Sequence, residues 1–220
     1  MTMQSREVPI DPAHAALLIV DVQNYCAHPD GAGSHALDAR QRHYLFGSLR
    51  EPVIFNLQLL QSACRRAHIE VVYAAVENMT RDGRDRSLDY KISGIDVPRG
   101  SWDAQILDEI TPGSDEMVFR KTSSSVFIST NIDYVLRNVG VRSLIVAGMM
   151  TDQCVESTVR DACDLGYLVT LASDACTTTS AERHEQSLIG IRGYCRQRQT
   201  EELVTEIAGV TNSANMGDRR

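Results

Sequence analysis

Apolar runs of strand length recur along the chain, with stretches of helical periodicity between them. Most of the runs are nearly continuous rather than alternating, which is typical of strands buried on both faces of a parallel sheet. They occupy residues 15–22, 69–76, 116–121, 143–148 and 167–173. The helical patterns lie at about 50–67, 103–109, 130–139, 153–165 and 180–190. Strands that alternate with helices predict an α/β fold with a helix-covered parallel sheet.

The least regular part of the chain is the segment from Asn78 to Ser101, which is rich in Arg, Asp, Gly and Ser. A loop of this length in a compact domain is usually a functional lid or a subunit contact, and a plain surface insertion is the alternative. The polar tail after Val210 is expected to be frayed. With 220 residues and no internal repeat, the chain is predicted to form a single domain, residues 1–220.

Charge and hydropathy narrow the possible partners. The net charge is −7 and basic residues form no extended cluster, so nucleic acid is not an expected partner. No apolar run approaches the roughly 18 residues that a membrane helix needs, and no export signal pattern is present. We therefore expect a soluble, cytoplasmic protein with a small-molecule partner and no membrane association.

The chain has six cysteines, and they are widely scattered without a CxxC pair. They are Cys26, Cys64, Cys154, Cys163, Cys176 and Cys195. In a chain without an export signal they are expected to be reduced thiols, and most of them to be ordinary buried residues.

Polar or reactive side chains follow three of the predicted strands. Asp21 ends the first apolar run, Lys121 ends the third, and Cys154 follows the fourth after a short turn. Ligands of open parallel sheets bind beyond the carboxyl ends of the strands, so these residues are candidates for chemistry. Each has an ordinary alternative as well: capping for Asp21, solvation for Lys121 and packing for Cys154. The coincidence of an acid, a cation and a thiol at one sheet edge favours function.

The surroundings of Cys154 strengthen this interpretation. Apolar residues at helical spacing from Gln153 to Leu165 place Cys154 in the first turn of a helix, where the helix dipole and a nearby lysine would stabilise a thiolate. Free N–H groups at that helix start could receive an oxyanion. Cys163 lies on the apolar stripe of the same helix and is interpreted as a structural cysteine. None of the six histidines follows a strand end, so none is expected to be a general base.

A thiol, a carboxylate and a lysine suffice for nucleophilic catalysis. The carboxylate takes the thiol proton, the lysine favours the thiolate, and the thiolate attacks a carbonyl group. The motifs "IVDVQN", "FRKTSSSVF" and "GMMTDQCVESTVRDA", which contain these residues, resemble those of the isochorismatase-like cysteine hydrolases. The resemblance extends from the first strand to about Cys195.

This resemblance implies a three-layer αβα fold around a mostly parallel, roughly six-stranded, Rossmann-like sheet. It makes Cys154 the nucleophile, Asp21 its general base and Lys121 the third member of a catalytic triad. It further implies a cis peptide bond between Met149 and Met150, an oxyanion hole formed by the N–H groups of Met150 and Cys154, and a homodimer or homotetramer. No cofactor is implied.

Differences among the branches of this family point to a reaction class. Nicotinamidases carry a metal site built from an Asp-x-His and further histidines after the second strand, but here the segment "ENMTRDGRDRS" contains no histidine, so no metal is expected. Isochorismatases that cleave a vinyl ether do not use a cysteine. The stretches "RGSWDAQILDEITPGSDEMVFRK" and "CVESTVRDA" look most like the ureidoacrylate and biuret amidohydrolases, although "TSSSVF" departs from the aromatic-containing version in that branch.

The predicted function is therefore a metal-independent amidohydrolase that cleaves a non-peptide C–N bond of a small linear amide, such as a ureido or carbamoyl compound, through a thioester. The alternatives are hydrolysis of an N-carbamoyl amino acid or an aryl carboxamide, and a catalytically silent metabolite-binding protein. Candidate substrate contacts are Gln23, Asn24, Glu77, Asn78 and Ser125. Strand-end capping is the alternative for the first four, and an N-cap before the helix at about 130 is the alternative for Ser125.

Overall fold

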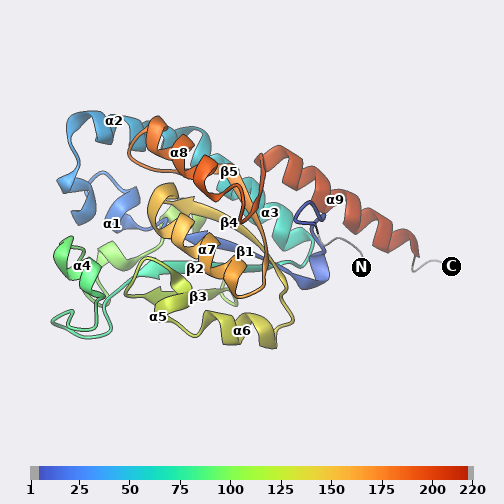
Figure 1. Ribbon diagram of the computed structural model, residues 1–220, viewed down its shortest axis with the longest axis horizontal. Coiled ribbons are helices and arrows are strands. Elements are labelled where there is room, and N and C mark those ends of the chain that lie inside the picture. The colour runs from blue at the N-terminus through green and yellow to red at the C-terminus, as the bar shows by residue number, and fades with distance from the viewer. Residues whose placement is uncertain (1–4, 218–220) are drawn as a thin grey trace.

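The computed structural model describes residues 5–217, with residues 211–217 described by their backbone alone. Within this range, six parallel strands form one sheet in the order β3-β2-β1-β4-β5-β6, which crosses the middle of the molecule (Figure 1). The strands are β1 (Ala15–Val20), β2 (Glu70–Val76), β3 (Met117–Lys121), β4 (Ser143–Met149), β5 (Leu168–Thr177) and β6 (Arg196–Arg198). The predicted α/β class and parallel sheet are confirmed.

Helices cover both faces of this sheet (Figure 1). The helices are α1 (Asn24–Ala27), α2 (Ala39–Ser48), α3 (Ile54–Arg66), α4 (Leu88–Ile92), α5 (Val126–Ser129), α6 (Ile132–Asn138), α7 (Glu156–Asp164), α8 (Ala181–Ile191) and α9 (Thr200–Gly217). Helices α3 and α9 pack together on one face, while α5, α6 and α7 lie on the other. The result is the three-layer arrangement.

Short 3-10 or π turns connect several of these elements. They are η1 (Pro12–His14), η2 (Ala32–Ala36), η3 (Leu49–Val53), η4 (Trp102–Ala104), η5 (Asp108–Ile110) and η6 (Thr151–Val155). Two of them extend a following helix, because η3 runs into α3 and η6 runs into α7.

The central strands are buried on both faces, as the continuous apolar runs predict. Every residue of β1 is at most 3% exposed, and β1 pairs with both β2 and β4. Burial of apolar surface contributes about 25 cal/mol per Å², so these strands contain much of the stabilising area. In β1 and β4 no polar side chain lies in the strand interior, so polar groups that can line a site follow at the strand ends.

The topology fixes where that site lies. From β1 the chain steps to β2 and β3 on one side, and β4 then pairs with the other side of β1. The carboxyl ends of β1 and β4 therefore flank the point at which the strand order reverses, which is where open parallel sheets bind ligands. Gly148 allows these two strands to meet there: its φ is +122°, and a Cβ atom would lie 2.2 Å from the carbonyl oxygen of Val20.

Several predicted boundaries are wrong. The helix expected at 103–109 is instead the two turns η4 and η5, because Ile106 between them forms an antiparallel bridge with Gln23 and is held extended. Helices α1, α2, α4, α5 and α9 and strand β6 were not predicted individually. The tail after Val210 continues as α9 to Gly217, and residues 218–220 lie outside the described range.

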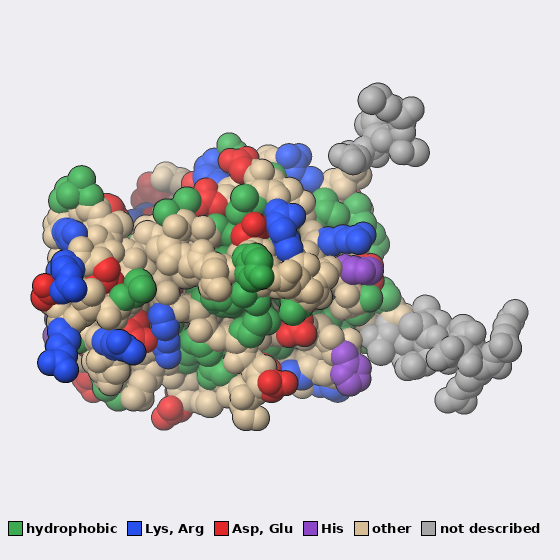
Figure 2. All heavy atoms as spheres, turned by 90° about the horizontal axis from the view of Figure 1, so that it is seen from below, with side chains coloured by type: hydrophobic (Ala, Val, Ile, Leu, Met, Phe, Trp, Pro, Cys, Tyr) green, Lys and Arg blue, Asp and Glu red, His purple; other side chains and the backbone are tan. Residues whose placement is uncertain are grey.

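The irregular segment 78–101 contains the short helix α4 and forms one end of the molecule. Figure 2 shows lysine and arginine side chains gathered at this end, with acidic side chains among them. The segment has five basic and four acidic residues, so its charge is nearly balanced. Hydrophobic side chains gather instead near the middle of the face in Figure 2.

Candidate active site

Three strand ends bring the predicted catalytic side chains to one edge of the sheet. Asp21 directly follows β1, and its φ of +54° turns the chain while its N–H group donates to the carbonyl oxygen of Ala74 at 2.8 Å. Aspartate tolerates this left-handed region better than most residues. Lys121 is the last residue of β3, and Cys154 lies in η6 after β4.

The three side chains are buried together. The ammonium nitrogen of Lys121 lies 2.8 Å from Oδ2 of Asp21 and 3.4 Å from Sγ of Cys154. Lys121 is 0% exposed and Asp21 is 3% exposed. The second carboxylate oxygen of Asp21, Oδ1, is buried without a hydrogen-bond partner among the described residues. The arrangement therefore combines a thiol, a cation and a carboxylate oxygen that is free to accept a proton.

Burial and charge act in opposite directions on this ion pair. Burial raises the pKa of the Asp21 carboxyl group, and the neighbouring Lys121 offsets only part of that rise. For Lys121, burial lowers the pKa, but the Asp21 carboxylate and the neighbouring Cys154 and Tyr90 raise it well above its ordinary value. Lys121 is thus a permanent ammonium ion, and Asp21 is a stronger base than an exposed aspartate.

The Cys154 thiol is neutral in this resting arrangement, although the helix start and the nearby lysine were expected to stabilise a thiolate. Burial raises its pKa to about 12; Lys121 lowers the pKa, but the Asp21 carboxylate raises it further. The position of Cys154 at a helix start is as predicted, but desolvation outweighs the cation and the helix dipole. A thiolate would form here only when the thiol proton moves to Asp21.

The turn that carries Cys154 is braced by α8. The peptide bond between Met149 and Met150 is cis, at the position where the family resemblance places one. The carbonyl oxygen of Met150 accepts from the N–H groups of Gln153 and Val155, at 3.0 and 3.2 Å. Thr151, which is fully buried, hydrogen-bonds through Oγ1 to Nδ1 of His184 at 2.9 Å. These contacts fix the backbone on both sides of the thiol.

A cavity of about 230 Å³ opens beside the thiol. Its lining includes Asp21, Cys154 and the two methionines of the cis bond, together with side chains from the segments after β1, β2 and β5. The further lining residues are Tyr25, Cys26, Gly33, Ala36, Leu37, Gln41, Val76, Tyr90, Ser93, Ile95, Gln153, Thr179 and Arg183. A cavity of this size fits a small molecule rather than a polypeptide.

A second thiol in this cavity, Cys26, is held differently. Its Sγ donates to the backbone carbonyl oxygen of Asp21 at 3.1 Å. Burial raises its pKa well above the ordinary value, and the Asp21 carboxylate raises it further. Without a carboxylate or cation contact of its own, Cys26 is poorly suited as a nucleophile.

Two of the proposed substrate contacts, Gln23 and Asn24, are used as structural braces. Gln23 is 0% exposed: its amide nitrogen donates to the carbonyl oxygens of Val76 and Asp103, each at 2.9 Å, and its amide oxygen accepts from the N–H group of Val76. Asn24 donates to the carbonyl oxygen of Trp102 at 3.0 Å. Neither is among the cavity-lining residues, so the capping alternative describes both of them.

Glu77 ties the irregular segment to the sheet, and Asn78 makes a hydrogen bond within that segment. Glu77 accepts from the N–H group of Gly100 at 2.7 Å and pairs with Arg120 at 3.0 Å. The amide nitrogen of Asn78 donates to Asp96 at 2.6 Å. Like Gln23 and Asn24, these side chains lie outside the cavity lining.

Ser125 is an N-cap, although of an earlier helix than expected. Its hydroxyl oxygen accepts from the N–H group of Phe127 at 3.2 Å and caps α5. The sequence therefore predicted Asp21, Met150 and Cys154, which line the cavity, but none of the other polar side chains in its wall. Tyr90, Gln153 and Arg183, which do line it, were not predicted.

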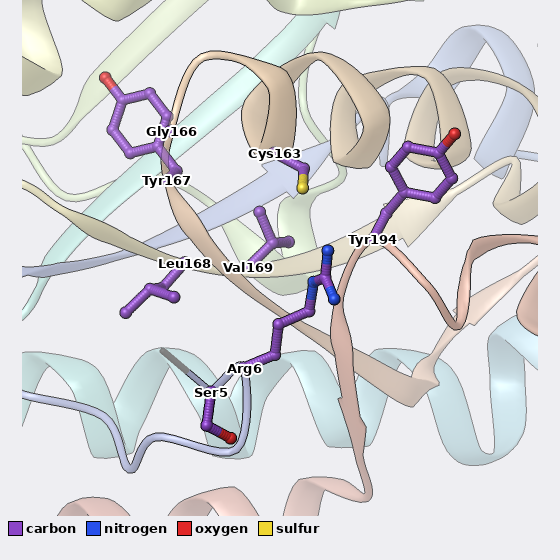
Figure 3. A pocket seen from close by; sticks show the side chains of 8 residues that line it. All are labelled: Ser5, Arg6, Cys163, Gly166, Tyr167, Leu168, Val169 and Tyr194. Atoms are coloured by element: carbon purple, nitrogen blue, oxygen red, sulfur yellow. The ribbon is translucent and has the colours of Figure 1, made fainter. Parts of the chain in front are cut away.

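A separate hollow of about 300 Å³ lies at the opposite, amino-terminal edge of the sheet. Figure 3 shows the Arg6 side chain extending into it between Cys163, Val169 and Tyr194. Cys163 is therefore half-buried at the wall of this hollow rather than packed in the core as expected. Among the described residues that line the hollow there is no carboxylate or lysine, so they do not provide the groups that accompany Cys154.

Among the residues that the structure describes, no three His, Cys, Asp or Glu side chains are grouped so that they could hold a metal ion. No helix in the same range is long and apolar enough to span a membrane.

Comparison with protein families gives one match over most of the chain. The isochorismatase domain model matches residues 15–202. This range contains all six strands and the three catalytic candidates.

Solved structures match the fold over nearly the whole chain. A cysteine hydrolase from Pseudomonas syringae pv. phaseolicola 1448A is 26% identical, with a TM-score of 0.79 over 95% of this chain and 99% of that chain. An isochorismatase family protein from Desulfovibrio vulgaris is 27% identical, with a TM-score of 0.71 over 89% of this chain and 99% of that chain. N-carbamoylsarcosine amidase from Thermoplasma acidophilum, at 22% identity and a TM-score of 0.68 over 85% and 96%, shares the fold.

Proposed function

Because the chain belongs to the isochorismatase family, whose domain covers residues 15–202, we propose that this hydrolase is an amidohydrolase with Cys154 as its nucleophile. One observation carries the proposal. Lys121 lies 2.8 Å from Asp21 and 3.4 Å from the sulfur of Cys154, in full burial, while the second oxygen of Asp21 is unpartnered. This constellation activates a thiol without histidine or a metal ion.

The first step is proton transfer from the Cys154 thiol to Oδ1 of Asp21. Before the transfer Asp21 is negative and Lys121 positive, and after it Cys154 is negative and Lys121 positive. The net charge of the buried group does not change, and the ammonium lies within 3.4 Å of both anions. The transfer therefore avoids the large cost of creating an isolated buried charge.

The thiolate then attacks the amide carbonyl carbon, and the C=O electron pair moves onto oxygen. The backbone N–H groups of Met150 and Cys154 are proposed as the oxyanion hole. In support of this, the Met150 carbonyl is occupied by Gln153 and Val155 rather than by the N–H group of Cys154. Removing one such donor typically costs a factor of 10² to 10³ in rate.

Asp21 carries the proton through the rest of the cycle. Collapse of the tetrahedral intermediate breaks the C–N bond, and Asp21 delivers its proton to the departing nitrogen, leaving a thioester. Water then attacks the thioester carbonyl while Asp21 takes a proton from it. Loss of the thiolate releases the acid and the proton returns to sulfur, so one water is consumed for each amide cleaved.

The preferred substrate class is a small ureido or carbamoyl compound, such as ureidoacrylate or biuret. These groups both donate and accept hydrogen bonds, and the cavity presents the matching side chains of Gln41, Ser93 and Gln153. Metal independence is proposed because the described residues contain no suitable ligand group.

A second candidate is an N-carbamoyl amino acid, and Arg183 favours it. This guanidinium lines the cavity and is anchored by Asp152 and Thr179, which hold it in place. Its side chain is still 43% exposed and can meet a substrate carboxylate. An aryl carboxamide would leave this charge unused.

Ammonia release from a substrate panel tests the proposal. The panel contains ureido acids, biuret, N-carbamoyl amino acids and nicotinamide, assayed without added metal. Activity on at least one member is expected, and Cys154→Ala should abolish it with an unchanged thermal melt. Cys163→Ala, which removes a half-buried thiol at the opposite edge of the sheet, is the matched control and should retain activity.

A folded protein that is silent over the whole panel would favour the alternative of a metabolite-binding member without catalysis.

We also propose that the protein is a cytoplasmic homodimer or homotetramer, as the family resemblance implies. Light scattering coupled to size-exclusion chromatography measures the mass of the assembly, and a monomer at micromolar concentration would contradict this.

A further inference from the structure

We propose that Tyr90 is a fourth catalytic residue, whose hydroxyl group donates a hydrogen bond to the sulfur of Cys154 and stabilises the thiolate. The Tyr90 oxygen lies 3.7 Å from Sγ of Cys154 and 3.0 Å from the ammonium nitrogen of Lys121. Tyr90 is 1% exposed and lines the cavity beside the thiol. It is therefore in contact with two of the three catalytic candidates.

Counting protons fixes the direction of these bonds. An ammonium group has three N–H donors. Around Lys121 they are shared among four acceptors, namely Asp21, the Tyr90 oxygen, the carbonyl oxygen of Ser123 and the sulfur of Cys154, at 2.8, 3.0, 2.9 and 3.4 Å. An ammonium nitrogen has no lone pair and so accepts no hydrogen bond. The Tyr90 oxygen thus accepts from Lys121, which leaves its own proton for the other neighbour within reach, the sulfur of Cys154.

The phenol keeps this proton throughout the cycle. Burial raises the pKa of Tyr90, and Lys121 offsets only part of the rise. Tyr90 consequently transfers no proton itself. When the thiol proton moves to Asp21, the sulfur becomes an anion, and Lys121 and Tyr90 both lie beside it as donors. The hydrogen bond from Tyr90 to the sulfur then becomes stronger, because its acceptor is now charged.

The local structure holds Tyr90 against the end of β3. The N–H group of Ser87 donates to the carbonyl oxygen of Thr122 at 2.9 Å, and the Ser87 hydroxyl caps α4 by accepting from the N–H group of Tyr90 at 3.2 Å. On the same helix Leu88 is 73% exposed and Ile92 is 78% exposed, whereas Tyr90 points inward. The irregular segment is thus anchored beside Lys121 and supplies a group to the reaction centre.

This inference depends on Cys154 as the nucleophile, but it can be tested without a substrate. The rate of alkylation by iodoacetamide is measured between pH 6 and 9, and the Cys154 adduct is quantified by peptide mass spectrometry to separate it from Cys26. In Tyr90→Phe the rate should fall by about tenfold or more, the effect of one hydrogen bond to a charged group. A purely structural loosening would expose the thiol and raise the rate instead.

Tyr73→Phe is the matched control, because Tyr73 is also fully buried and its hydroxyl is bonded, to Gln61 and Glu116, without contact to Cys154. Its alkylation profile should be that of the wild type. If Tyr90→Phe does not fold, Ser87→Ala replaces it. The Ser87→Ala variant removes the cap of α4 but keeps the hydroxyl group of Tyr90. It should also slow the alkylation of Cys154, by a smaller factor than Tyr90→Phe.

An unchanged or faster alkylation of Cys154 in the folded Tyr90→Phe or Ser87→Ala variant overturns the role of Tyr90. If ammonia release by the wild type is intact in that case, the proposed amidase function stands. If alkylation is slower but no panel member releases ammonia, the opposite holds: the role of Tyr90 stands and the proposed amidase function is wrong.

Discussion

At the scale of single residues, the buried Asp21 and Lys121 pair is central to the proposed mechanism. Both groups are almost inaccessible to water, so each depends on the other for its charge. The attraction between buried ions only about balances the cost of removing them from water. The pair is consequently explained better by the proton transfer that it permits than by any contribution to stability.

Replacing the base alone should therefore damage both activity and stability. In Asp21→Asn, Lys121 keeps its charge without a carboxylate at 2.8 Å. We expect the free energy of unfolding to fall by about 3–5 kcal/mol and kcat to fall by a factor of roughly 10² to 10⁴. Urea denaturation and the ammonia assay measure the two effects.

The double variant Asp21→Asn with Lys121→Met separates these effects. Removing the second charge leaves no unpaired buried ion, so most of the stability should return while activity stays absent. If the double variant were less stable than Asp21→Asn, the interpretation of Lys121 as a buried ammonium paired with Asp21 would be wrong.

The pH profile of kcat/KM should show when the thiol ionises. Asp21 must be unprotonated to act as base, so activity should rise with pH through the pKa of Asp21, which lies above its ordinary 3.8 because of burial. Above that limb the rate should stay level to pH 10, since the pKa of the thiol is about 12. A rising limb near pH 8.5, the ordinary thiol value, would contradict transfer to Asp21.

At the scale of helices and strands, the sequence predicted the elements whose pattern comes from burial. Strands β1, β2, β3 and β4 lie within two residues of the predicted bounds, because their apolar runs end where the chain leaves the core. Strand β5 runs four residues beyond its predicted end, to Thr177, because polar and apolar residues mix there. Strand β6 (Arg196–Arg198) reads "RQR" and has no apolar signal, since it lies at the sheet edge.

The cavity lining was harder to predict than the catalytic candidates. Asp21, Lys121 and Cys154 follow strands, so the parallel topology alone predicts that they meet. Tyr90 comes from the irregular segment, where Leu88 and Ile92 have the helical spacing that normally marks a buried face, yet both are exposed. Gln23 has the polar character of a ligand contact, but its side-chain amide is hydrogen-bonded to the backbone C=O and N–H groups of Val76.

The contact between β1 and β4 gives a prediction at this scale. In Gly148→Ala the new Cβ would lie 2.2 Å from the carbonyl oxygen of Val20, and the residue would have to keep a φ of +122°. We expect a loss of about 2–4 kcal/mol in the free energy of unfolding, from strain and overpacking together. Denaturant unfolding measures this loss.

Gly47→Ala is the matched control for Gly148→Ala. Gly47 lies inside α2, and a Cβ there would meet nothing within 4 Å. Alanine should stabilise this helix by up to about 1 kcal/mol. Equal losses at the two positions would mean that the close approach of β1 and β4 does not require glycine.

At the scale of the whole molecule, one ionic cluster joins parts of the chain that are far apart in sequence. Glu206 on α9 accepts from the N–H group of Ile10 at 2.6 Å and binds both terminal nitrogens of Arg196, on the edge strand, at 2.8 and 3.0 Å. Arg196 is only 3% exposed. The cluster fixes α9 to β6 and to the segment that leads into β1, on the side of the sheet away from α7.

Removing Glu206 should consequently loosen the fold without touching the active site. In Glu206→Ala, Arg196 would remain buried and unpaired, and we expect a loss of about 3 kcal/mol in denaturant unfolding with an unchanged rate of Cys154 alkylation. Glu201→Ala, on the exposed face of the same helix, should cost less than about 1 kcal/mol.

The contribution of Glu206 to the stability of the wild type should also depend on pH. Burial raises the pKa of Glu206, but Arg196 and the Ile10 N–H group lower it by more than burial raises it. The pKa of Glu206 therefore lies below its ordinary 4.5. The stabilisation is therefore present above pH 4.5 and is lost as the pH falls through the lowered value. If Glu206→Ala and the wild type lost stability in parallel as the pH falls from 5 to 3, the cluster would not be what joins these segments.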